Sequence, residues 1–95
     1  MAGVIKPEFP KEVVFITSRI ILSRLWFKLT PQVCDFFHAA LAHYQEIYNV
    51  EIYAFCLMGN HYHLLARFPK GNRAPFVRDF NSILARSLPH MLKEF

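Results

Sequence analysis

Two histidines, His61 and His63, stand two positions apart in the run 58–65 (MGNHYHLL). Successive side chains of a β-strand point to opposite faces, so a strand here would place both imidazoles on one face. Their Cα atoms would then lie about 6.5 Å apart, which allows two imidazoles to reach one divalent ion. The run therefore predicts a pair of metal ligands. For an isolated His-x-His, two ordinary histidines with one packed in the core would be the simpler interpretation.

The dipeptide Gly59-Asn60 lies between two apolar runs and predicts a two-residue β-hairpin turn. We expect Gly59 to supply the positive φ that a type II′ turn needs at its first position. Such a turn pairs Cys56 with His63, which brings a sulfur close to the predicted metal site. A buried Cys56 with a purely structural role is the simpler expectation.

The hairpin register divides the side chains of both strands between two faces of the expected sheet. One face would carry Ile52, Ala54, Cys56, Met58, His61, His63, Leu65 and Arg67. The other face would carry Tyr53, Phe55, Leu57, Tyr62, Leu64 and Phe68. Both faces are largely apolar, so we expect both to be covered, by helices or by a second subunit. Tyr53 and Tyr62 would then point away from the histidines.

The rest of the chain predicts the elements that position this hairpin. The β-branched and aromatic run 13–18 predicts a first strand, and residues 19–29 either extend it or form a loop. Thr30-Pro31 predicts the start of a helix that ends at Asn49, with a core stripe of Val33, Phe37, Ala40, Tyr44 and Ile47. A second helix is expected from about Phe76, with Pro89 stopping or kinking it.

The resulting order is β-α-β-β-α, an α+β fold with an antiparallel sheet. It is ferredoxin-like but lacks the last strand of a βαββαβ unit. Residues 1–12 are expected to form an irregular N-terminal arm, because Pro7 and Pro10 oppose a helix. We expect residues 1–95 to form a single, partial domain.

Composition excludes several classes of protein. Apolar residues make up 54% of the 95 residues, which is too many for a disordered chain. No apolar run reaches the roughly 18 residues of a membrane span, and no signal peptide is recognisable. Two cysteines without a Cys-x-x-Cys spacing indicate reduced thiols and a cytoplasmic protein. The net charge of +4 is compatible with a polyanionic partner.

The hexapeptide Asn60-His61-Tyr62-His63-Leu64-Leu65 resembles the His-hydrophobic-His signature of the HUH single-strand DNA endonucleases. More narrowly, it is similar to the motif of the IS200-like or REP-associated tyrosine transposases of bacterial mobile elements. Supporting similarities are Thr17 and Arg19 at the end of the first strand, the pair Tyr53-Ala54, and the segment 76–88. The resemblance covers about residues 13–88, with Gly59 in place of the proline usual in the family.

The resemblance implies DNA transposition through metal-dependent nicking and strand transfer of single-stranded or hairpin DNA. His61 and His63 would hold Mg²⁺ or Mn²⁺ against the scissile phosphate, with Asn60 supporting the turn. A tyrosine hydroxyl would form a covalent 5′-phosphotyrosine. In the family this tyrosine lies on a later helix, so we expect it beyond Phe95 and expect no catalytic tyrosine here. The full-length family implies a homodimer.

Further residues and other functions follow from the same sequence. Five arginines are candidates for contacts with DNA phosphates: Arg19, Arg67, Arg73, Arg78 and Arg86. An alternative function is a non-catalytic module that stacks unpaired bases on Tyr53, Phe55 and Tyr62. A structural domain without a ligand is a third possibility. Substitution of both histidines distinguishes the first two functions, because only the first depends on a bound metal.

Overall fold

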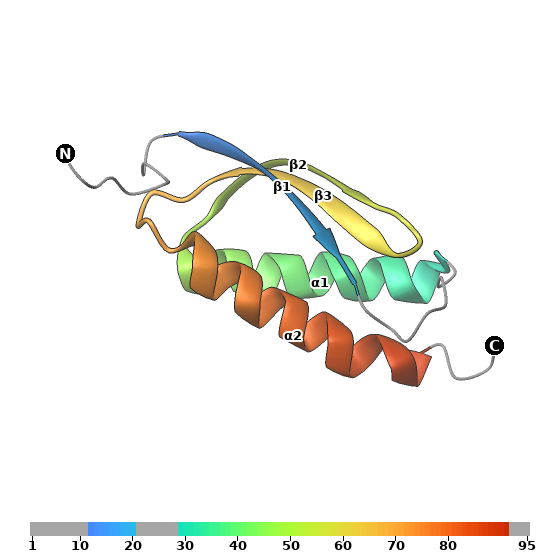
Figure 1. Cartoon of the computed structure of the whole chain (residues 1–95). Coiled ribbons are helices and arrows are strands. Elements are labelled where there is room, and N and C mark those ends of the chain that lie inside the picture. The colour runs from blue at the N-terminus through green and yellow to red at the C-terminus, as the bar shows by residue number, and fades with distance from the viewer. Residues whose placement is uncertain (1–11, 21–28, 92–95) are drawn as a thin grey trace.

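The computed structural model describes residues 12–20 and 29–91. Its elements, in chain order, are β1 (Val13–Arg19), α1 (Pro31–Tyr48), β2 (Glu51–Leu57), β3 (His61–Arg67) and α2 (Arg73–Met91). The strands form one layer, and both helices lie against the same face of it (Figure 1). The α+β class and the order β-α-β-β-α are confirmed. Most of the expected arm and residues 21–28 of the ambiguous segment lie outside the described residues.

Strand β3 occupies the centre of the three-stranded sheet, whose order is β1-β3-β2. It is antiparallel to both neighbours, so β1 and β2 run parallel to each other with β3 between them. Helix α1 connects these two outer strands, which makes β1-α1-β2 a split β-α-β unit. At the middle of the sheet His63 pairs with Thr17 of β1 and with Cys56 of β2.

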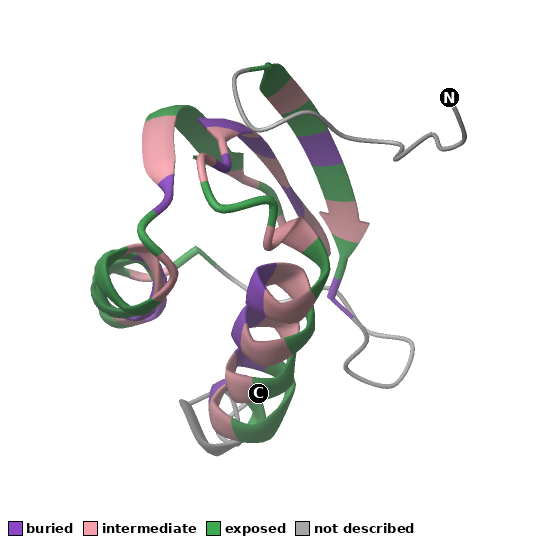
Figure 2. Cartoon of the chain, turned by 90° about the vertical axis from the view of Figure 1, so that its left-hand side faces the viewer, coloured by how far each residue is buried: buried purple, intermediate pink, exposed green. Residues whose placement is uncertain are grey.

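The core lies between the sheet and the helices, where the ribbon in Figure 2 is purple for buried residues. Tyr62, Leu64 and Ala66 alternate along β3 and are fully buried. Their partners are aromatic rings of the helices: Phe37 of α1 lies 5.7 Å from the ring of Tyr62, and Phe80 of α2 lies 5.3 Å from it. Such tilted ring pairs add to the stabilisation from burial itself.

Helix α1 begins and ends where the sequence predicts. The hydroxyl of Thr30 accepts a hydrogen bond from the backbone N–H of Val33 at 3.1 Å, and Pro31 is the first helical residue. Asn49 ends the helix in the left-handed conformation, at φ 56°. Ile47, however, is 56% exposed, so its assignment to the core stripe is wrong.

Helix α2 begins three residues earlier than predicted, at Arg73. The carbonyl of Asn72 accepts a hydrogen bond from the N–H of Phe76. The first turn of the helix therefore includes Pro75. A proline is tolerated there because the N–H groups of a first turn have no partner within the helix. Of the two effects predicted for Pro89, it does not stop the helix, since α2 continues to Met91.

The hairpin has the predicted pairing but a different turn. Leu57 pairs with Tyr62, and the N–H of Met58 donates to the carbonyl of His61 at 2.7 Å. Among the described residues a positive φ occurs at Asn49 and Gly71, so the prediction of a positive φ at Gly59 is wrong.

A β-bulge in β2 corrects the predicted faces. The register shifts between Ile52 and Ala54, with Tyr53 as the extra residue. Ile52 therefore pairs with Ala66 and packs against the core, and Glu51 takes the place opposite Arg67. The histidine-bearing side of the sheet is also not covered by any described element, contrary to the expectation of two covered faces.

The two faces of β3 predict different effects for two neighbouring leucines. Leu64→Ala should lower the free energy of unfolding by about 2–5 kcal/mol, because it leaves a cavity in the core. Leu65→Ala removes the same atoms from the half-buried opposite face and should cost less than half as much. Urea unfolding of both variants checks this, and equal losses would contradict the assignment of faces.

Candidate functional site

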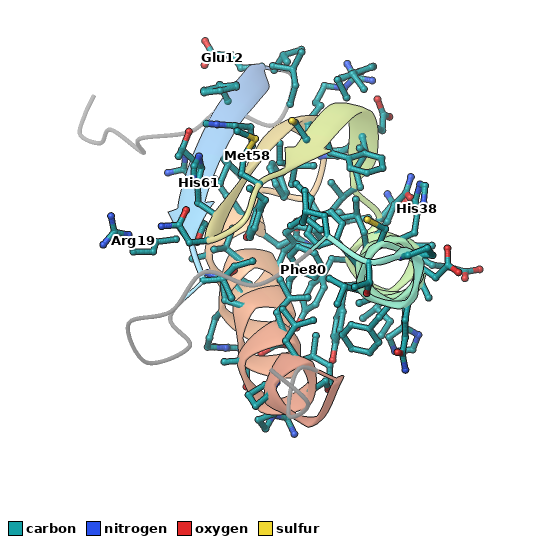
Figure 3. All side chains as sticks on the ribbon, turned by 90° about the vertical axis from the view of Figure 1, so that its right-hand side faces the viewer. Glu12, Arg19, His38, Met58, His61 and Phe80 are labelled. Atoms are coloured by element: carbon teal, nitrogen blue, oxygen red, sulfur yellow. The ribbon has the colours of Figure 1, made fainter. Side chains whose placement is uncertain are left out.

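We call the uncovered side of the sheet the histidine face. It carries residues from all three strands: Val13, Phe15, Thr17 and Arg19 of β1, Glu51, Ala54 and Cys56 of β2, and His61, His63, Leu65 and Arg67 of β3. In Figure 3, His61 and Arg19 lie on the side of the sheet away from Phe80, which packs in the core. The sequence prediction that the two histidines share a face is confirmed.

The two imidazole rings lie next to each other, with centroids 4.9 Å apart and planes at 88°. The Nδ1 atom of His61 is 2.8 Å from the side-chain oxygen of Asn60. An amide oxygen only accepts hydrogen bonds, so this Nδ1 carries the ring hydrogen and Nε2 keeps its lone pair. Asn60 therefore prepares His61 to coordinate through Nε2.

Strand β1 fixes the second histidine. The hydroxyl of Thr17 lies 3.0 Å from Nδ1 of His63, directly across the strand pair. The ring of Phe15 stacks on the same imidazole, with centroids 5.5 Å apart and an angle of 15° between the planes. Because Nδ1 of His63 is engaged, Nε2 is its available coordinating atom.

The donor set at this position is two imidazole nitrogens. Among residues 12–20 and 29–91, no group of three or more His, Cys, Asp or Glu side chains is placed to hold a metal ion. Cys56 is exposed rather than buried as expected, and its thiol donates to the sulfur of Met58 at 3.7 Å. Both cysteines, Cys34 and Cys56, are free and exposed.

The tyrosine between the two histidines belongs to the core. The Tyr62 hydroxyl donates to the side-chain oxygen of Asn81 at 2.7 Å, and the Asn81 amide donates to the hydroxyl of Ser18 at 3.0 Å. Burial raises the pKa of Tyr62 to about 12, because the phenolate would lose its hydration. Tyr62 is therefore neutral at ordinary pH and has no access to the histidine face.

The other three of the four tyrosines also lie away from His61 and His63. Tyr53 donates to Glu51 at 2.9 Å at the end of β2 farthest from the hairpin turn, and this bond raises the pKa of Tyr53. Tyr44 and Tyr48 belong to α1, behind the sheet, where Tyr48 donates to Asp79. No tyrosine of this chain stands beside the histidine pair.

Two of the five candidate arginines lie on the histidine face. Arg19 is exposed and pairs with His61 across the sheet. Arg67 is at the other end of β3, where its guanidinium contacts the carboxylate of Glu51 at 2.6 Å. The hydrogen bonds from Arg67 hold the pKa of Glu51 below its usual range. Arg19 is thus the candidate nearest to the histidines.

The other three arginines belong to α2. Arg73 and Arg78 line a cleft of about 520 Å³ beside β1, and Arg78 also contacts Asp79 at 3.0 Å. Arg86 is exposed and donates to the carbonyl of Ser82 at 3.3 Å. It lies on the helix layer rather than on the histidine face. Their contacts with DNA remain predictions.

Sequence reasoning missed two features of this site. It treated Phe15 only as part of a strand, and it assigned Asn60 to the turn without a role for its side chain. The alternation of the run 13–19 contains the signal for Phe15, because residues 15, 17 and 19 share a face. The contact of Asn60 with the neighbouring ring depends on the turn conformation, which the sequence does not predict.

Comparison with known proteins places the chain in a family. The family model described as Transposase IS200 like matches residues 23–95, most of the chain. The chain belongs to the IS200-like transposase family. Membership implies a role in DNA transposition and DNA as the partner. No curated protein and no solved structure matches the chain.

The family match does not include β1. The contacts of Phe15 and Thr17 with His63 therefore come from the structure alone. Within the described part of this IS200-like chain, neither helix is long and apolar enough to cross a membrane.

The contact with Asn60 predicts the tautomer of His61. Asn60→Ala removes the acceptor that holds the hydrogen on Nδ1, so the His61 ring should become a mixture of tautomers. Imidazole ¹⁵N chemical shifts report this directly. The signals of His38, which lies on α1, serve as the internal control and should not change. An unchanged His61 spectrum would contradict the orienting role of Asn60.

The burial of Tyr62 predicts a structural and pH-dependent effect. Tyr62→Phe leaves Asn81 without its donor and should lower the free energy of unfolding by about 1–3 kcal/mol. The folded pKa of about 12 lies above the ordinary 10.0, so the stability from the neutral phenol is present below pH 10 and lost as the pH rises through 12.

The phenylalanine variant should therefore lack that alkaline loss of stability, as measured by urea unfolding across this pH range. Loss of divalent metal binding in Tyr62→Phe, with the fold intact, would contradict the separation of Tyr62 from the histidine face.

Proposed function

We propose that this chain binds a divalent metal ion through His61 and His63 and thereby holds a phosphate of single-stranded DNA for nicking and strand transfer. One observation carries the proposal: the rings lie 4.9 Å apart, and each Nδ1 is engaged by a neighbour. The rings would therefore coordinate through their Nε2 atoms, on a face that no described element covers. Two histidines packed for structural reasons alone would have no need of this arrangement.

The donor set favours Mn²⁺ over Mg²⁺, because Mg²⁺ prefers oxygen ligands while imidazole suits the transition metals. When bound, such an ion polarises a phosphate oxygen and neutralises charge that develops in the transition state. Two protein ligands alone give modest affinity. Water and DNA oxygens would have to supply the remaining ligands, so metal and DNA should strengthen each other's binding.

The chain's own residues have three roles in this proposal. Asn60 keeps His61 in the tautomer that coordinates through Nε2, and Thr17 orients the ring of His63. Arg19, across from His61, attracts the phosphates that flank the bound one. Tyr62 anchors β3 to the core, which keeps the two imidazoles at a fixed separation.

The attacking hydroxyl comes from outside the four tyrosines of this chain. Family resemblance assigns it to a helix that follows the segment described here, in a homodimeric protein. We propose that the complete fold is ferredoxin-like, with an additional strand at the open edge of β1. The uncovered histidine face is then the surface that receives the tyrosine.

The alternative function, a non-catalytic module that stacks bases on Tyr53, Phe55 and Tyr62, does not fit the structure. It required Tyr53, Phe55 and Tyr62 on one open face, yet Tyr62 is fully buried. Phe55 also faces the helices, where its ring lies 5.8 Å from that of Phe37.

Two double histidine variants should differ in how Mn²⁺ changes their affinity for single-stranded DNA. The double variant His61→Ala/His63→Ala should lose the increase in single-stranded DNA affinity that Mn²⁺ produces in the wild-type chain. The control variant His38→Ala/His43→Ala changes two histidines of α1 and should keep it. Fluorescence anisotropy of a labelled oligonucleotide, with and without Mn²⁺, measures both.

Equal Mn²⁺ dependence in the two double variants would contradict the proposal. A wild-type affinity for DNA that does not depend on Mn²⁺ would favour a non-catalytic binding module instead.

A further inference from the structure

Phe15 is the most exposed large apolar side chain in the described part of the chain, at 64%. It lies in the middle of β1, between Val14 and Ile16, which both face the core. Leaving a phenylalanine in water forgoes about 1.5–3 kcal/mol of burial. Burial in the core therefore does not account for an aromatic residue here.

The ring of Phe15 is held in a defined orientation. It stacks on the imidazole of His63 at 5.5 Å, nearly parallel to it. Thr17 fixes that imidazole through Nδ1, so the two rings form a small aromatic surface immediately beside the proposed phosphate site.

A shallow apolar hollow of about 220 Å³ adjoins this surface. Small side chains on β2 create it: Ala54 pairs with Leu65 and Cys56 pairs with His63, and neither fills the space above the sheet. Phe15 forms one wall of the hollow. A flat apolar ring can thus enter from the histidine face and contact the Phe15 side chain.

Phe15 also borders the cleft of about 520 Å³ beside β1, together with Thr17, Arg73 and Arg78. An apolar recess and a cleft with basic side chains therefore meet at one aromatic residue. Single-stranded nucleic acid has the complementary chemistry, with flat bases that stack on aromatic rings and an anionic backbone.

We propose that Phe15 is a base-stacking platform, and that an unpaired nucleobase next to the phosphate at His61 and His63 occupies the hollow. This proposal rests on the proposed function and adds how the base next to the bound phosphate is held. In a duplex, neighbouring base pairs cover both faces of each base, so stacking on Phe15 requires a single strand.

The test uses the full 95-residue chain and a labelled short oligothymidine in Mn²⁺. Phe15→Ala should weaken binding about tenfold or more, while Phe15→Trp, which keeps an aromatic ring, should retain it. Val13→Ala is the matched control, because Val13 is 53% exposed on the same face of β1. A single abasic site, moved along the oligonucleotide, locates the stacked base.

At that position wild-type chain and Phe15→Ala should bind the abasic oligonucleotide equally well. The proposal is overturned if Phe15→Ala binds the intact oligonucleotide as tightly as the wild-type chain does. It is also overturned if Phe15→Ala lowers the affinity for every abasic oligonucleotide by the same factor. An unchanged DNA affinity with altered self-association in sedimentation assigns Phe15 to a protein interface and also overturns it. Mn²⁺ dependence of the wild-type chain is scored separately, so failure of the metal site is distinguishable from failure of the platform.

Discussion

Successive side chains of β3 point alternately into the core and out to the histidine face, and this alternation determines where His61 and His63 lie. Tyr62, Leu64 and Ala66 point into the core and are fully buried, so the strand cannot slide by one residue without exposing all three. The same constraint forces His61 and His63 to the opposite, uncovered face. Core packing therefore sets the separation and direction of the imidazoles before any ligand binds. A pre-organised pair of ligands loses less conformational entropy on coordination than two free side chains.

Both neighbours of β3 contribute to this arrangement, and their contributions differ. From β1, Thr17 holds Nδ1 of His63 and Phe15 stacks on its ring. From β2 come small side chains, Ala54 and Cys56, which leave a hollow beside the ring. One edge strand thus orients the ligand, while the other leaves space next to it. This division of roles suits the proposed function, in which the site would hold a phosphate and admit part of a DNA strand.

Features controlled by local chemistry or periodicity were predictable from the sequence. Thr30 and Asn49 as the ends of α1, the pairing of Cys56 with His63 and the inward orientation of Tyr62 follow from capping and alternation. The bulge at Tyr53, the lack of a positive φ at Gly59 and the exposed Cys56 were not predictable. They depend on how the sheet twists and on which elements cover it, and these are properties of tertiary packing.

In the proposed function, His61 and His63 together hold one metal ion. Paramagnetic Mn²⁺ broadens the NMR signals of nuclei close to it, so titrating Mn²⁺ into the chain with specifically labelled histidines measures their proximity to the ion. We expect the His61 and His63 ring signals to broaden together at the lowest Mn²⁺ concentrations, and more readily with single-stranded DNA present. The signals of His38 and His43 on α1 should stay sharp. Uniform broadening of all four, or broadening of His38 and His43 first, would contradict the proposal.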